Sequence, residues 1–186
     1  MDNKPDKIPC VLIVMGVSGS GKSTIAESLA ERLAWSYEDG DKFHPPGNVA
    51  KMKAGQPLTD SDRWPWLMAI ADEIDRVCLA GRHAVIACSA LKRAYRDVLV
   101  QGRSDVRIIF LNGTQALIAS RLARRKGHFM PPGLLDSQFA TLEPPDDGEN
   151  PVTVSIDASV GAIVDDIVRQ LKPGLLDSGV ARRNRV

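Results

Sequence analysis

The sequence predicts an α/β protein in which helices cover both faces of a five-stranded parallel sheet. Three observations support this fold class. Short, continuous apolar segments alternate along the chain with segments whose apolar residues recur at helical spacing. A glycine-rich loop joins the first apolar segment to the first helical one. Polar residues follow several of the apolar segments, and the carboxyl ends of parallel strands are where such folds collect their sites.

The stretch from Cys10 to Leu33 organises the rest of the prediction. It reads CVLIVM, then GVSGSGKS, then TIAESLAERL. The first block is a continuous apolar run, as expected for a strand that is buried on both faces. The last block places Ile25, Leu29 and Leu33 on one face of a helix. A strand, a loop and a helix in this order are the context that a phosphate-binding loop requires.

The loop itself matches G-x-x-x-x-G-K-[ST], the phosphate-binding P-loop. Glycines allow the backbone N–H groups to approach phosphate oxygens, and the following helix points its positive dipole end at the same anion. We expect Lys22 to contact the β- and γ-phosphates and the Ser23 hydroxyl to bind Mg²⁺. A chance match in a glycine-rich turn is the alternative. The predicted nucleotide-binding residues are Gly16, Val17, Ser18, Gly19, Ser20, Gly21, Lys22, Ser23 and Thr24.

The other elements follow from the same kind of pattern. The expected strands after the first cover residues 35–38, 83–88, 106–111 and 152–156. The expected helices cover a turn at 48–54, then 62–80, 91–100, 114–126, 134–141 and 160–171. Pro65 places the start of the long second helix near Asp62, because proline is tolerated only in the first turn. Residues 126–142, bounded by glycine and proline, are expected to form a mobile lid.

Length and composition favour one domain over residues 10–172, with a disordered lead-in at 1–9 and a loose tail at 173–186. The net charge of +1 gives no indication of a nucleic-acid or acidic-membrane partner. No apolar stretch approaches the roughly 20 residues that span a bilayer. Cys10, Cys78 and Cys88 lie in apolar stretches without metal-ligand spacing. This odd count predicts buried thiols in a reducing cytoplasm.

Two carboxylates are the first candidates for catalysis. The sequence lacks the Asn-Lys-x-Asp motif expected of a GTPase, which leaves small-molecule kinases as the leading class. Asp39 and Asp41 follow the second expected strand, and on extended chain their side chains would point the same way. One would support the Mg²⁺ shell and the other would accept the proton of the attacking hydroxyl. The alternative is an ordinary Asp-Gly-Asp turn with solvated carboxylates.

Basic residues supply the other candidates. Arg121 and Arg125 lie four apart on one helix face, where they would stack on adenine and clamp the transferring phosphoryl group, or simply face solvent. Ser89 directly follows a strand, and its hydroxyl would either contact the substrate or cap the next helix. Taken singly, each isolated basic residue is more often a surface residue than a ligand. The further substrate candidates are His44, Lys51, Arg63, Lys92 and His128.

Five blocks of the sequence resemble the small P-loop gluconokinases. They are GVSGSGKST, DGDKFHPPGNVAKMKAGQPLTDSDRWPWL, CSALKRAYRD, RLARRKGHFM and QFATLEPP, in one order from about Val11 to Pro145. The resemblance implies a cytoplasmic homodimer with a three-layer P-loop kinase fold. It implies transfer of the ATP γ-phosphate to the 6-hydroxyl of D-gluconate, with Mg²⁺. By analogy, Asp41 meets the substrate hydroxyl, Asp39 the metal, Arg121 the adenine and Arg125 the phosphate.

The resemblance makes Lys22, Asp41 and Arg125 the expected catalytic residues and assigns the metal to Ser23 and Asp39. One departure concerns the third strand, which ends in Cys88-Ser89 rather than in an aspartate, so no Walker-B carboxylate is evident. The alternatives are another small-molecule kinase, such as a shikimate or adenylylsulfate kinase, and a nucleotide-gated binding protein without catalysis. A nucleotide acceptor would favour an aromatic pocket, whereas the segment after Asp39 is rich in charged residues.

Overall fold

The computed structural model describes residues 8–100, 102–124 and 133–171. Most of the expected lead-in, the expected tail at 173–186 and the first part of the expected lid lie outside these ranges. So do Arg125 and His128, whose predicted roles therefore stay predictions.

The core is a five-stranded parallel sheet, as the sequence predicts. Its strands are β1 (Val11–Met15), β2 (Ser36–Asp39), β3 (Ala84–Ala87), β4 (Val106–Asn112) and β5 (Val152–Ser155), in the order β2-β3-β1-β4-β5. The central strand β1 pairs with β3 on one side and β4 on the other. All of its residues are buried, which explains why its sequence is a continuous apolar run.

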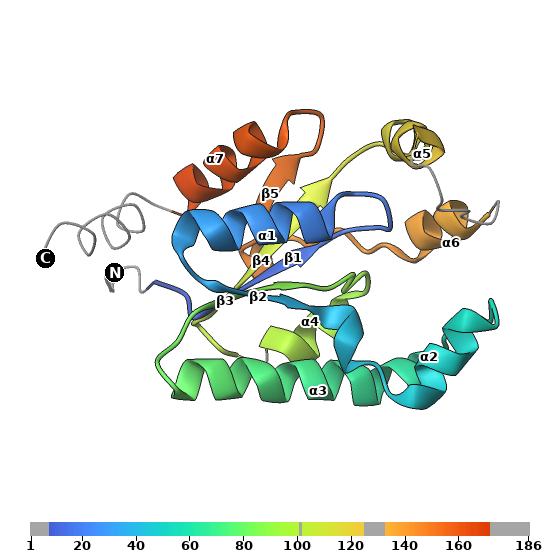
Figure 1. Cartoon of the computed structure of the whole chain (residues 1–186), viewed down its shortest axis with the longest axis horizontal. Helices are drawn as coiled ribbons and strands as arrows, with labels where there is room; N and C mark the ends of the chain where they lie inside the picture. Colours follow the sequence, from blue (N-terminus) through green and yellow to red (C-terminus); the bar gives the residue numbers. More distant parts are fainter. Residues whose placement is uncertain (1–7, 101, 125–132, 172–186) are drawn as a thin grey trace, which may run out of the picture.

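Helices cover both faces of this sheet (Figure 1). The helices α1 (Lys22–Leu33) and α7 (Val160–Gln170) cover one face, and α3 (Asp60–Leu79) and α4 (Arg93–Val100) cover the other. Alternate residues of β1 therefore enter different cores. Leu12 and Val14 pack in the core under α1 and α7, whereas Ile13 and Met15 pack in the core under α3. This arrangement is the three-layer structure expected from the sequence.

The remaining helices gather at the end of the sheet where the strands finish (Figure 1). They are α2 (Pro46–Lys53), α5 (Gln115–Arg124), α6 (Leu134–Thr141) and the short 3₁₀ helix η1 (Gly40–Phe43), whereas a second 3₁₀ helix, η2 (Asp147–Glu149), directly precedes β5. The loops that follow β1, β2 and β3 open at this same end, so the predicted site residues are brought together there. None of the helices in the described ranges is long and apolar enough to cross a membrane.

The start of α3 differs from the prediction. The helix begins at Asp60, two residues earlier than expected, because Thr59 and Asp62 form a capping box. The Thr59 hydroxyl accepts a hydrogen bond from Asp62 N at 3.2 Å, and the Asp62 carboxylate accepts one from Thr59 N at 2.9 Å. Pro65 consequently lies in the second turn of a continuous helix.

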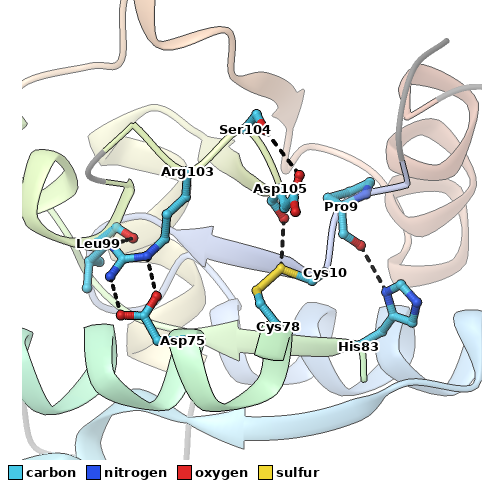
Figure 2. Close-up of a disulfide and its surroundings, with 9 residues drawn as sticks. All are labelled: Pro9, Cys10, Asp75, Cys78, His83, Leu99, Arg103, Ser104 and Asp105. Carbon is cyan, nitrogen blue, oxygen red and sulfur yellow. Dashed lines mark hydrogen bonds and ion pairs between the residues drawn. A yellow bond between two sulfur atoms is a disulfide. The ribbon is translucent and has the colours of Figure 1, made fainter. Parts of the chain in front are cut away.

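The cysteines also differ from the prediction. Cys10 and Cys78 form a disulfide with a Cα–Cα distance of 5.4 Å, which links the residue before β1 to the carboxyl-terminal part of α3 (Figure 2). Apolar surroundings predicted their burial, but no sequence pattern showed that two residues 68 positions apart would meet. Cys88 is a free, buried thiol, and burial raises its pKa to about 12. Its thiolate is therefore scarce at neutral pH, which argues against a nucleophilic role.

Candidate active site

The P-loop connects β1 to α1 at the centre of the sheet. Gly21 is the N-cap residue of α1 and has a φ of 94°, in the left-handed region that glycine adopts without strain. The Lys22 ammonium group donates to Val17 O at 3.1 Å, so its side chain folds back over the loop. Within the described residues the buried Ser20 hydroxyl has no hydrogen-bond partner. A buried polar atom of this kind suits a loop that receives an anionic ligand.

A cavity of about 360 Å³ adjoins the P-loop. It lies between the amino-terminal half of α1, the helix α5 and the connection from β5 to α7. Arg121 lines it and also donates a hydrogen bond to Ile156 O, which ties α5 to the end of β5. Its lining is mostly small and apolar, as a planar base requires: Gly19, Ser20, Gly21, Thr24, Ile25, Arg121, Ala158, Ser159, Val160 and Ile163.

The two predicted carboxylates lie at the end of β2, but not on extended chain. Asp39 ends the strand and its Oδ1 accepts a hydrogen bond from Asp41 N at 3.0 Å, because residues 40–43 form the 3₁₀ helix η1. The extended arrangement expected from the spacing is therefore wrong. Gly40 permits this turn to approach β3, since a Cβ atom there would lie 2.5 Å from Ala87 O. The Asp41 side chain remains 79% exposed and accessible to an acceptor substrate.

Tyr37 is a site residue that the sequence did not single out. It lies on β2 near Ser23, at the start of α1. Burial raises the pKa of the Tyr37 phenol, and the nearby carboxylates of Asp39, Glu27 and Asp41 raise it further, whereas Ser23 acts to lower it. Ser23 and Asp39, the two predicted metal ligands, thus both influence the pKa of this phenol. Because Tyr37 lies on a half-buried strand, nothing in the sequence indicated that it lies near the predicted metal ligands.

Ser23 and Asp39 would hold a magnesium ion only together with further ligands from the nucleotide. A hydroxyl and a carboxylate supply the oxygen ligands that Mg²⁺ prefers. No group of three or more His, Cys, Asp or Glu side chains in the described parts of the chain could hold a metal ion. An ion bound here would complete its coordination with phosphate oxygens and water, as in kinases generally.

His44 is held rigidly beside Asp41. Its ring stacks on Trp66 with 4.3 Å between ring centroids, and the Trp66 indole donates to Gly40 O at 2.8 Å. The buried Asn48 amide lies 3.3 Å from His44 Nδ1 and donates to Asp62 O at 2.7 Å. Burial lowers the pKa of His44, so the ring is neutral at neutral pH. With Nδ1 accepting from Asn48, Nε2 carries the proton and lies 3.9 Å from an Asp41 oxygen.

Three predicted substrate cations surround the start of α3. Lys92 and the Tyr95 hydroxyl both bind Asp60, with 2.8 Å from the Lys92 ammonium group to Oδ2. Arg63 lies 3.9 Å from the same carboxylate. Lys51 pairs with Asp62 at 2.7 Å, and this bond with those from Thr59 lowers the pKa of Asp62 to about 2. The sequence identified the three cations as substrate candidates, and the structure shows that Asp60 joins two of them, Lys92 and Arg63.

The connection from β3 to α4 carries Ser89 and Lys92. Because α4 begins at Arg93, Ser89 is too far from the helix to cap it, and that alternative is wrong. The Glu143 carboxylate instead accepts from Arg93 N at 2.6 Å. The fully buried Arg96 binds the backbone of this connection. It donates to the carbonyl oxygens of Ala90 and Leu91 at 3.1 and 3.2 Å.

The P-loop after β1, the carboxylates at the end of β2 and a cluster of cations all lie at one end of a parallel sheet. This combination defines a small-molecule kinase of the P-loop class. A family profile described as an AAA domain matches residues 11–145.

The relatives of the chain give the family. It is 46% identical to the gluconokinase of Gluconobacter oxydans over 164 residues, which cover 88% of this chain and 92% of that protein. It is 41% identical to the thermoresistant gluconokinase of Escherichia coli, over 88% and 94% of the two chains. A crystal structure of a gluconokinase from Sinorhizobium meliloti superposes with a TM-score of 0.81 at 39% identity, covering 96% and 99% of the two chains. The chain belongs to the gluconokinase family.

Two alternatives are represented among the more distant structures. An adenylylsulfate kinase from Mycobacterium tuberculosis superposes with a TM-score of 0.64 at 18% identity, and a shikimate kinase from Aquifex aeolicus with 0.54 at 14%. At this level of identity the likeness is one of fold alone.

Proposed function

We propose that this chain transfers the γ-phosphate of ATP to the 6-hydroxyl of D-gluconate with Mg²⁺, as a cytoplasmic homodimer. The observation that carries the proposal is the group of three cations and two carboxylates beside Asp41. Its net positive charge, next to a candidate base, suits a polyol that bears a carboxylate. The identities of 41–46% to gluconokinases from two bacteria support the same substrate.

The nucleotide side of the site is the P-loop and its adjoining cavity. Backbone N–H groups of the P-loop residues 16–24, that of Ser18 included, and the Lys22 ammonium group would hold the phosphates, and the adenine would enter the cavity lined by Thr24 and Arg121. Ser23 and Asp39 would hold the metal, which when bound neutralises the charge on the phosphates. Transfer of a phosphoryl group runs through a loose transition state, so positioning contributes most of the catalysis.

The acceptor side is centred on Asp41. Its exposed carboxylate would accept the proton of the 6-hydroxyl as the oxygen attacks phosphorus. The neutral His44 directs a ring N–H to the same place and would donate a hydrogen bond to a substrate hydroxyl. Because His44 is held by Trp66 and Asn48, this donor is oriented before the substrate arrives.

Arg63 is the cation best placed to receive the gluconate carboxylate. Lys51 and Lys92 already form hydrogen-bonded ion pairs at 2.7 and 2.8 Å, whereas Arg63 is 3.9 Å from its nearest carboxylate oxygen. One of its nitrogens donates to Leu58 O at 2.7 Å, which fixes the side chain. The planar guanidinium presents further donors in a fork that matches a carboxylate.

Steady-state kinetics of Arg63→Met test this proposal. A charge-assisted hydrogen bond is worth about 1.5–3 kcal/mol, so KM for gluconate should rise roughly 10- to 150-fold while KM for ATP stays unchanged. Lys53→Met is the matched control, because it removes one exposed positive charge from the nearby helix α2. An unchanged gluconate KM in Arg63→Met would move the carboxylate elsewhere. A wild-type chain that released no ADP with gluconate would refute the function itself.

A further inference from the structure

A side chain from α6 binds a backbone N–H group of the P-loop. The Gln138 amide oxygen accepts a hydrogen bond from Ser18 N at 2.6 Å, across 120 positions of the sequence. Ser18 lies inside the glycine-rich loop whose backbone N–H groups point at phosphate oxygens in proteins of this class. A carboxamide oxygen carries partial negative charge and accepts a hydrogen bond as a phosphate oxygen does. Gln138 thus occupies a position of the kind that a phosphate oxygen takes.

The helix that carries Gln138 is well anchored apart from this contact. Its apolar side packs against the core under α1 and α7 through Leu135 and Phe139. Gln115 of α5 donates a hydrogen bond to Asp136, which joins α6 to its neighbour. After the helix, Glu143 N donates to Leu91 O at 2.9 Å, in the connection that carries Lys92. The helix α6 therefore lies between the nucleotide side and the acceptor side.

We propose that Gln138 is a latch that competes with the nucleotide for the P-loop. Without nucleotide, its amide oxygen satisfies Ser18 N and holds α6 against the loop. When ATP enters, a phosphate oxygen takes over this N–H group and Gln138 is released. The exchange lowers the affinity for ATP by the strength of the hydrogen bond that is given up. It also transmits nucleotide binding to α6 and hence to the connection that carries Lys92.

This inference rests on ATP binding at the P-loop. It predicts that two different substitutions of Gln138 change the Kd for ATP in opposite directions. Gln138→Leu removes the competing oxygen at similar size, so the Kd for ATP should fall roughly two- to tenfold, the net worth of one hydrogen bond. Gln138→Glu replaces the amide with a carboxylate, which binds the N–H group more strongly and repels the phosphates. The Kd for ATP should then rise about tenfold or more.

Isothermal titration of the full chain with ATP and with adenosine is the test. Both substitutions should leave adenosine binding unchanged, because adenosine has no phosphate to compete for Ser18 N. Gln115→Leu is the matched control, since it breaks a different contact of α6, the bond from α5 to Asp136, away from the loop and should leave the ATP Kd unchanged. A purely structural role would weaken ATP binding in both Gln138 variants, and a direct contact with ATP would weaken it in Gln138→Leu. Either result overturns the proposal.

The readout also separates this inference from the proposed function. Binding of ATP is measured without gluconate. Opposite shifts in the two Gln138 variants would therefore support the latch even in a chain that phosphorylated a different acceptor. Equal or absent shifts would refute the latch and leave the gluconate reaction untouched.

Discussion

Replacing Arg96 with methionine should destabilise the protein severely, although the residue lies outside the proposed catalytic groups. The Arg96 side chain is 1% exposed and forms a two-point ion pair with Glu149, whose side chain is 8% exposed, at 2.5 and 2.9 Å. The same guanidinium binds two carbonyl oxygens of the connection from β3 to α4. The substitution leaves the buried Glu149 carboxylate with only the partly exposed Arg93, 4.0 Å away, and breaking a buried ion pair typically costs about 3–5 kcal/mol.

Urea unfolding of Arg96→Met and of Arg96→Met/Glu149→Met measures this cost. Removing both partners leaves no buried charge, so the double variant should regain at least half of the lost free energy of unfolding. The effect should also depend on pH. Burial raises the pKa of Glu149, but the bonds from Arg96 and the Asp146 backbone have the opposite and larger combined effect. The net pKa of Glu149 therefore lies below its ordinary value of 4.5. The ion pair is therefore fully stabilising above pH 4.5, and the gap between wild type and Arg96→Met should narrow as the pH falls below it. A single variant within 1 kcal/mol of wild type at neutral pH would refute the reasoning.

Three further predictions concern the loop, the carboxylates and the disulfide. Lys22→Ala should lower kcat by about 10²-fold or more with an unchanged melting temperature, as measured by ADP release and circular dichroism; near-normal turnover would remove this loop from catalysis. Asp41→Asn should lower kcat by roughly 10²–10⁴ and keep the Kd for ATP within about threefold, whereas the defect of Asp39→Asn should shrink as Mg²⁺ is raised. If both defects vanish at high Mg²⁺, Asp41 is not the base. Reducing Cys10–Cys78 should lower the free energy of unfolding by up to about 4 kcal/mol, since the bond closes a loop of 68 residues. Cys78→Ala, which has no cross-link to lose, should show no response to the reductant; an equal response in both would contradict the assignment.

The sequence predicted the sheet and the nucleotide loop because their signals are local. The β1 run, the glycines and the helical spacing of Ile25, Leu29 and Leu33 depend on neighbours in the chain, and all are confirmed. Element boundaries were less accurate where side chains decide them. The capping box of Thr59 and Asp62 moved the start of α3, and the turn at Gly40 placed Asp41 on a 3₁₀ helix.

The parts that sequence reasoning missed depend on contacts between distant residues. The pair Arg96–Glu149 is separated by 53 positions, and Gln138 meets Ser18 across 120. The burial of Arg96 could not be predicted, because a basic residue near others in the sequence gives no indication of whether it is buried. The role of Asp60 could not be predicted either, because only the fold brings Lys92 and Tyr95 to it.

Identification of the phosphorylated product tests the central claim most directly. The purified chain is incubated with ATP, Mg²⁺ and, in separate reactions, D-gluconate, shikimate and adenylylsulfate, and the products are examined by ³¹P and ¹³C NMR. We predict ADP release with gluconate alone, and a phosphoryl group attached at C6 of that acid. Phosphorylation of gluconate at another carbon, or preferential phosphorylation of shikimate or adenylylsulfate, would contradict the account.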